Sequence, residues 1–121
     1  MLAEAFHVEG RALNDGMCVC EGCENPAGRW AHHLVEKSWL RLNGLERHMW
    51  DWANACPICD GCHERHTNGS RPIGRADLVA AGIWRSVVEW AEAMDRRVAK
   101  GPGHRPVSSR LERTYPELVV A

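Results

Sequence analysis

The sequence has no apolar run that approaches the roughly 18 residues of a membrane-spanning helix. Its N-terminus, MLAEAFHVEGR, also lacks the basic start and the apolar stretch of a secretion signal. No internal repeat is present. From these absences we expect a cytoplasmic protein that does not bind a membrane.

The sequence also has little net charge, because its 16 acidic residues nearly balance its 15 basic ones. This balance argues against bulk attraction to nucleic acid or to a membrane surface. It is uneven along the chain, with nine acids and five bases in residues 1–60 and seven acids and ten bases in residues 61–121. We therefore expect any polyanion to contact the second half.

Six cysteines are the most informative residues present. A chain of 121 residues has room for one compact domain with a modest apolar interior. In a reducing cytoplasm these cysteines are not expected to form disulfides. They fall into two groups with C-x-x-C spacing, which is typical of metal ligands: Cys18, Cys20 and Cys23, then Cys56, Cys59 and Cys62.

A structural zinc ion takes four tetrahedral ligands, so two C-x-x-C pairs are needed. Cys20 and Cys23 are predicted to form the first pair. The second is either Cys56 with Cys59 or Cys59 with Cys62, and spacing alone does not decide between them. We favour Cys59 with Cys62, because this choice leaves His63 directly after the last ligand. Cys18 and Cys56 then become spare thiols, interpreted as small buried apolar residues.

The patterning predicts short elements around these groups. Residues 6–8 are a possible strand, residues 29–35 and 52–59 are predicted strands, and residues 39–52 a broken helical excursion. A helix is expected from Asp60, its predicted N-cap. Residues 76–100 form one kinked helix or two, with an apolar stripe of Val79, Ile83, Val87, Ala91, Met94 and Val98. Residues 101–121 are rich in Gly, Pro and Arg, and we expect a loosely packed to disordered tail.

Taken together, the motifs resemble the HNH endonucleases that have a zinc-stapled ββα-metal core and are common among bacterial and phage proteins. The resemblance covers residues 18–67 and rests on C-x-x-C, H-H, N and C-x-x-C-H, which appear here as CEGC, His32-His33, Asn54 and CDGCH. It implies an α+β fold with C-terminal helices. Residues 1–100 would be a single nuclease domain with its motif core at 18–67 and a helical extension at 76–100, followed by a tail at 101–121. A bacterial cell or a phage-infected host is implied.

The resemblance also implies the roles of individual residues. His33 would be the general base that activates water, and His32 and His63 would hold a catalytic divalent ion such as magnesium or manganese. Asn54 would orient the base or set the loop geometry. The four-cysteine zinc site would be structural and separate from the chemistry. The partner would be DNA.

Two departures from the family pattern stand out. The interval from His33 to Asn54 is longer than the family's Gly-rich loop, so the base and the helix could be posed differently. The family's further histidine, four residues after the first on the helix, is replaced by Thr67, and a histidine falls instead at His66. His66 could bind the ion, contact a phosphate or simply be exposed. If His66 does not bind the ion, water and substrate oxygens would complete its coordination shell.

Several residues have more than one interpretation. Arg65, Arg71 and Arg75 follow the predicted catalytic helix and are candidates for phosphate contacts, or else form an ordinary solvated face. The six tryptophans are expected in the core, although one or two could stack on a base. His7, His48 and His104 are expected to be solvated or locally hydrogen-bonded rather than functional.

Two other functions compete with a nuclease. One is a zinc-stapled nucleic-acid-binding module in which the histidines have no catalytic role. The other is a phage packaging accessory protein that works only beside a phage or bacterial partner. The sequence does not indicate an oligomeric state.

Overall fold

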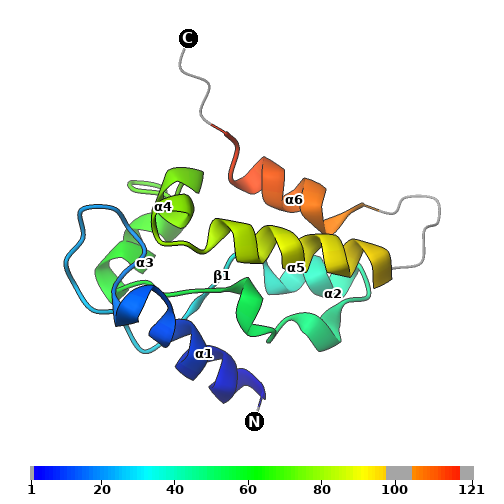
Figure 1. The fold of residues 1–121 in the computed structure, drawn as a ribbon, viewed down its shortest axis with the longest axis horizontal. Helices are drawn as coiled ribbons and strands as arrows, with labels where there is room; N and C mark the ends of the chain where they lie inside the picture. Colours follow the sequence, from blue (N-terminus) through cyan, green and yellow to red (C-terminus); the bar gives the residue numbers. More distant parts are fainter. Residues whose placement is uncertain (1, 98–104, 118–121) are drawn as a thin grey trace.

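Six α-helices accompany a two-stranded antiparallel sheet in the computed structural model, which describes residues 2–97 and 105–117 (Figure 1). The fold is therefore of the mixed α+β class. No helix in these two described ranges is long and apolar enough to cross a bilayer. The α-helices are α1 (Leu2–Ala12), α2 (Lys37–Leu42), α3 (Asp60–Thr67), α4 (Arg75–Ala80), α5 (Trp84–Arg97) and α6 (Val107–Thr114).

The sheet is much shorter than the predicted strands. Strand β1 (His32–His33) pairs with β2 (Ala55–Cys56), so that His32 faces Cys56 and His33 faces Ala55. Beyond β2, the carbonyls of Pro57 and Ile58 accept hydrogen bonds from the backbone of Val19 and Gly28. The second predicted strand thus pairs with β1 over two residues only. The residues that follow Cys56 hydrogen-bond to the loop that carries the first cysteine group. A short 3-10 helix, η3 (Trp52–Asn54), precedes β2.

Helix α1 occupies the region where residues 6–8 were expected to form a strand, and that expectation is wrong. Phe6 and Gly10, four residues apart, are the buried positions of this helix. A Cβ atom at Gly10 would lie 2.6 Å from the Cβ of Ala31 and 2.9 Å from that of Ala55. Only glycine lets α1 approach the sheet this closely. The alternation over residues 6–8 was too short to distinguish the two-residue period of a strand from the 3.6-residue period of a helix.

The segment between the two strands is a broken helical excursion, as predicted. It consists of α2, a 3-10 helix η2 (Glu46–His48) and η3, and Gly44 turns the chain at a φ of 72°. Leu40 and Leu45 are buried in the main core. The excursion therefore contributes to the interior rather than forming a surface loop.

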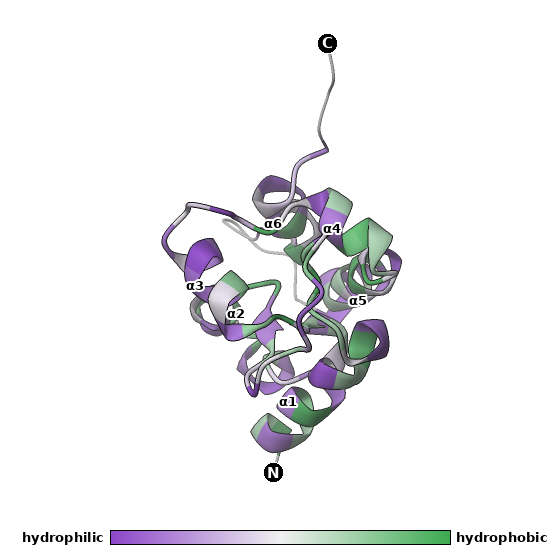
Figure 2. Cartoon of the chain, turned by 90° about the vertical axis from the view of Figure 1, so that its left-hand side faces the viewer, coloured by the Kyte–Doolittle hydropathy of each residue, from purple (hydrophilic) through white to green (hydrophobic). Residues whose placement is uncertain are grey.

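Helices α4 and α5 are two helices separated by a bend at Gly82, where φ is 73°. Val87, Ala91 and Met94 of the predicted stripe are buried, as is Ile83. Val79 was predicted to be part of the stripe but is exposed, and Leu78 is buried in its place. Val98 lies outside the described residues. Both hydrophilic and hydrophobic residues lie along α5 (Figure 2), as expected for a helix that covers a core.

The C-terminal segment is packed over residues 105–117, so the expected loose tail is wrong there. Val107, Leu111 and Tyr115 follow each other at four-residue spacing and are at most 1% exposed. Asp95 of α5 accepts hydrogen bonds from the backbone of Val107 and from the hydroxyl of Ser108. Helix α6 lies along α5 (Figure 1), and the Tyr115 hydroxyl donates to the Leu34 carbonyl after β1. The remainder of the predicted tail, 101–104 and 118–121, lies outside the described residues.

Candidate metal centre and imidazole pocket

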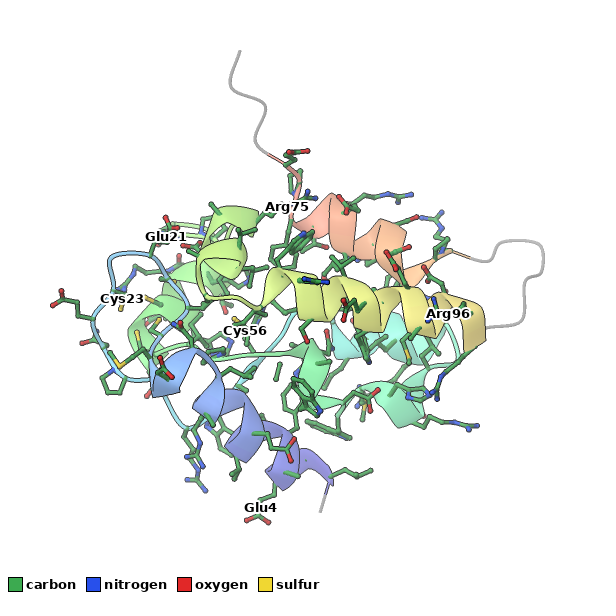
Figure 3. The ribbon with its side chains drawn as sticks, in the orientation of Figure 1. Glu4, Glu21, Cys23, Cys56, Arg75 and Arg96 are labelled. Atoms are coloured by element: carbon green, nitrogen blue, oxygen red, sulfur yellow. The ribbon has the colours of Figure 1, made fainter. Side chains whose placement is uncertain are left out.

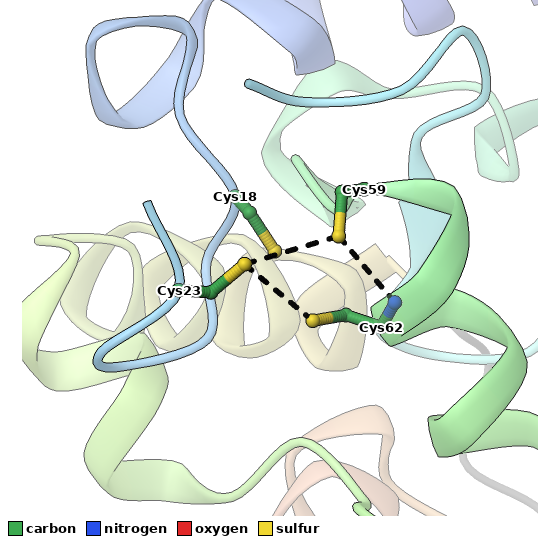
Figure 4. A group of neighbouring side chains, drawn as sticks. All are labelled: Cys18, Cys23, Cys59 and Cys62. Atoms are coloured by element: carbon green, nitrogen blue, oxygen red, sulfur yellow. Dashed lines mark hydrogen bonds between the residues drawn. The ribbon is translucent and has the colours of Figure 1, made fainter. Parts of the chain in front are cut away.

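Four cysteine sulfurs gather where the first cysteine loop meets the start of α3 (Figure 4). They belong to Cys18, Cys23, Cys59 and Cys62, and all lie within 4.8 Å of one another. The Sγ of Cys23 is 3.9 Å from that of Cys59 and 3.7 Å from that of Cys62. Four thiols at these separations could bind one metal ion.

The separations suit a tetrahedral ion such as zinc. Four sulfurs bound tetrahedrally at about 2.3 Å would lie about 3.8 Å apart. The sulfur pairs of Cys23 lie close to that value. All four donors are thiols, the ligand type of closed structural zinc sites. The donor set therefore fits a structural zinc ion, and it leaves no position open for a reacting water.

The backbone at the start of α3 positions the two cysteines that this segment contributes to the cluster. Cys59 is the N-cap of α3, and its sulfur accepts a hydrogen bond from the backbone N–H of Cys62. The prediction of Asp60 as the N-cap is therefore wrong by one residue. Arg65, one turn further along α3, donates to the Cys62 sulfur at 3.1 Å. Burial raises the pKa of the Cys62 thiol, but donors including Arg65 outweigh it and lower this pKa to about 7.

The first half of the cluster corrects the predicted ligand set. Cys18 contributes a sulfur to the group in place of Cys20, whereas Cys59 and Cys62 both belong to it, as expected. The two arms of the loop are joined at its base, where Met17 forms a β-bridge with Pro26 and the Cys18 N–H donates to the Asn25 carbonyl. The loop is therefore wider than a C-x-x-C turn. Cys18 and Cys23 thus lie on the two arms of the loop. Cys20 is buried outside the set of four, and Cys56 is buried as predicted.

An ion pair fixes this loop against α4. Asp77 accepts two hydrogen bonds from Arg71 and one from the backbone N–H of Glu21, all at 2.9 Å. Burial by itself would raise the Asp77 pKa, but these hydrogen bonds lower it to about 2. Asp77 therefore ties the cysteine loop to α4, and Arg71 holds the Asp77 carboxylate in position.

A cavity of about 500 Å³ has four imidazoles in its lining. His32 and His33 enter it from β1, and His63 enters it from the first turn of α3. We call this cavity the imidazole pocket. Three of the predicted catalytic side chains thus line one cavity.

His32 is the central imidazole. Its ring centroid lies 5.5 Å from that of His63 and 4.7 Å from that of His66. Burial, and then the neighbouring imidazoles, lower the His32 pKa to about 3. The ring is therefore neutral at physiological pH and keeps a lone pair for a metal ion. In the described part of the chain, however, only the thiols meet the mutual spacing of a complete ligand group.

A hydrogen bond from the backbone holds the His66 ring in place. Its Nδ1 accepts a hydrogen bond from the Ile73 N–H at 2.8 Å. In the neutral ring the proton then resides on Nε2, which makes this nitrogen a donor rather than a ligand. The contact favours the interpretation of His66 as a phosphate contact over its interpretation as a ligand.

His33 lies among aromatic rings. It stacks on Phe6 of α1, with centroids 4.2 Å apart, and its centroid is 5.2 Å from that of Trp50. Burial and the nearby Lys37 lower the His33 pKa to about 4, while a hydrogen bond with the Met49 backbone opposes them. The Nε2 atom is buried without a hydrogen-bond partner. The ring is thus neutral and held by packing, and one nitrogen remains unused.

Asn54 has a different position from the histidines. It is fully buried, its Oδ1 accepts from the Val35 N–H at 2.8 Å, and its Nδ2 donates to the Val35 carbonyl at 3.0 Å. Both ends of the carboxamide are therefore occupied by the chain that leaves β1. Of its predicted roles, setting the local geometry agrees with these contacts.

The three candidate arginines all make intramolecular contacts. Arg65 contacts the Cys62 sulfur and Arg71 pairs with Asp77. Arg75, the first residue of α4 (Figure 3), donates to the Tyr115 carbonyl, pairs with Glu112 of α6 and lies over the Trp84 ring. Their assignment as phosphate contacts stays a prediction, and a structural role accounts for each of them.

His7 was expected to have no role, yet it lines the imidazole pocket from α1. Its Nδ1 accepts a hydrogen bond from the Ala31 N–H at 3.0 Å. No sequence signal identified it, because α1 lies outside the motif and was not predicted as a helix.

Comparisons with protein-family models, curated proteins and solved structures found no match to this chain. The function of the chain is therefore inferred from its own residues.

Proposed function

We propose that this protein is a metal-dependent HNH endonuclease that hydrolyses phosphodiester bonds in DNA. The observation that carries the proposal is that His32, His33 and His63, from β1 and α3, line one cavity beside the thiol cluster. A zinc ion at that cluster would hold the cysteine loop against the start of α3, and so keep the two sources of imidazoles together.

His33 is the general base of the proposed reaction. Its free Nε2 takes a proton from a water molecule as the water oxygen attacks phosphorus, and the bond from phosphorus to the leaving sugar oxygen breaks. That sugar oxygen leaves with a proton from solvent. Stacking on Phe6 and an edge-on contact with Trp50 hold the ring in place so that little reorganisation is needed.

His32 and His63 would hold the divalent ion, with water and substrate oxygens completing its shell. When bound, this ion supplies electrostatic stabilisation of the charge that develops on phosphate and on the leaving oxygen. His66 would donate its Nε2 proton to a phosphate oxygen, because its Nδ1 is occupied by Ile73. Asn54 acts as a positioning residue for the chain that follows β1.

A second candidate is a zinc-stapled nucleic-acid-binding module without catalysis. The observation that favours it is the burial of the His33 Nε2, which water must reach before the ring can act as a base. The packing accessory function would require a partner protein for activity, and it is a variant of the nuclease proposal.

Zinc-loaded protein should be incubated with supercoiled plasmid, with magnesium or manganese added in one arm and omitted in the other. Chelators should be avoided because they would also remove the structural zinc. We expect nicked and linear products only in the arms with added ion. Retarded but intact plasmid in every arm would reject the nuclease in favour of the binding module.

A further inference from the structure

A second cavity, of about 550 Å³, adjoins the imidazole pocket and shares His7 and Trp30 with it. We call it the α1 groove, because one wall is α1 and the other is the chain that leads into β1. It is lined chiefly by Glu4, His7, Arg11, Arg29, Trp30 and Trp50. The proposed function leaves this groove without a role.

Trp30 is half exposed at the boundary between the two cavities, with 52% of its surface accessible. The guanidinium of Arg29 lies 4.8 Å from its ring centroid, and the His7 ring meets it nearly perpendicularly at 5.0 Å. A large aromatic ring that is held by neighbours and still faces solvent offers a platform on which a flat apolar group can stack.

The polar groups of the groove favour an anion. Among the described residues, Arg11 and Arg29 form no ion pair with an acidic side chain. His7 accepts from the Ala31 N–H through Nδ1, so its neutral ring carries a proton on Nε2 and can donate it. Glu4 is the one acidic residue in the groove and lies near the outer end of α1 (Figure 3).

We propose that the α1 groove binds the nucleotide next to the scissile phosphate of a single-stranded or locally unpaired nucleic acid. The base stacks on Trp30, and Arg11 and Arg29 contact the adjoining phosphate. A paired base has no free face for this stack, so the groove selects unpaired strands. This inference rests on the proposed function, which assigns the scissile phosphate to the neighbouring imidazole pocket.

The spacing along the chain agrees with this placement. Trp30 precedes His32 by two residues, and both side chains line the imidazole pocket, so the Trp30 ring lies next to the imidazoles. A strand with its phosphate at the imidazoles would therefore place its next base at Trp30.

The test measures binding of fluorescein-labelled 12-nucleotide DNA and RNA strands, and of the corresponding blunt DNA duplex. It uses zinc-loaded protein without magnesium or manganese, so that no cleavage is needed. Trp30→Ala is compared with Trp52→Ala, because Trp52 is 50% exposed but lines neither cavity. Arg29→Gln is compared with Arg85→Gln on the outer face of α5.

We expect wild type to bind a single strand, DNA, RNA or both, more tightly than the duplex. Trp30→Ala should weaken that binding at least about 5-fold, the value of one stacked base, and Trp52→Ala should not. Arg29→Gln should weaken it and reduce its salt dependence, unlike Arg85→Gln. Equal binding by the two tryptophan variants, or tighter binding of the duplex, would overturn the inference.

The two proposals fail separately. Trp30-dependent binding without any plasmid cleavage would reject the nuclease and leave the groove as a nucleotide site. Cleavage of single-stranded substrate at the wild-type rate by Trp30→Ala would reject the groove and leave the nuclease.

Discussion

Cys18→Ser is expected to lose the zinc ion and to unfold the protein, whereas Cys20→Ser is expected to keep both the ion and the fold. Of these two cysteines, only Cys18 has its sulfur in the group of four that lie within 4.8 Å of one another. Binding of a structural zinc ion contributes about 10–16 kcal/mol, as much as the whole unfolding free energy of a typical domain, about 5–15 kcal/mol. Loss of one ligand should therefore abolish cooperative folding.

Cys20 provides a closely matched control, because it is two residues away and equally buried, at 4% exposure against 3% for Cys18. Burying a serine hydroxyl there should cost only about 1–3 kcal/mol. Zinc content by elemental analysis and thermal unfolding by circular dichroism would compare the variants. A zinc-free, unfolded Cys20→Ser beside an intact Cys18→Ser would return the ligand set to the C-x-x-C pair.

His33→Ala is expected to reduce plasmid cleavage by at least about 100-fold, with the zinc content unchanged. The loss follows from removal of the general base, which is typically worth 10²–10⁴-fold in rate. His33 also stacks on Phe6, so the alanine variant loses packing as well. His33→Gln, which fills more of the same space, should be equally inactive and should melt closer to wild type.

His48→Gln is the control for the loss of an imidazole outside the pocket, since His48 pairs with Asp51 and lines neither cavity. It should cleave at the wild-type rate. Cleavage by His33→Gln at the rate of His48→Gln would show that His33 is only a packing residue. Initial rates of plasmid nicking at equal zinc occupancy would decide between these outcomes.

Local sequence patterns predicted the parts of the site that depend on neighbours in the chain. The run from Cys59 to His63 placed two sulfurs and one imidazole on the first turn of a helix, and the structure agrees. The adjacent pair His32 and His33 identified the strand that enters the pocket. In both places the side chains that come together are near neighbours in the chain.

Long-range contacts decided what the sequence left hidden. Cys18 replaces Cys20 because Met17 pairs with Pro26 and the Val19 N–H donates to Pro57, and neither pairing is visible in the spacing. Asp77, six residues further along the chain, binds the Arg71 guanidinium. An arginine that was a candidate for contacting phosphate is thus paired within the protein. Gly10 brings α1, and with it His7, to the pocket.

The C-terminal segment shows a limit of composition as a guide. Its Gly, Pro and Arg content suggested disorder, but Val107, Leu111 and Tyr115 repeat every four residues. Three apolar residues at helical spacing were enough to bury one face of α6 against α5. The periodicity of a short segment was more informative than its overall composition.

Zinc-edge X-ray absorption of protein loaded with one equivalent of zinc would show whether the thiols form a metal site separate from the imidazoles. We expect a first shell of four sulfurs at about 2.3 Å and no nitrogen. A shell containing nitrogen at about 2.0 Å would place zinc among the histidines and refute a separate thiol site.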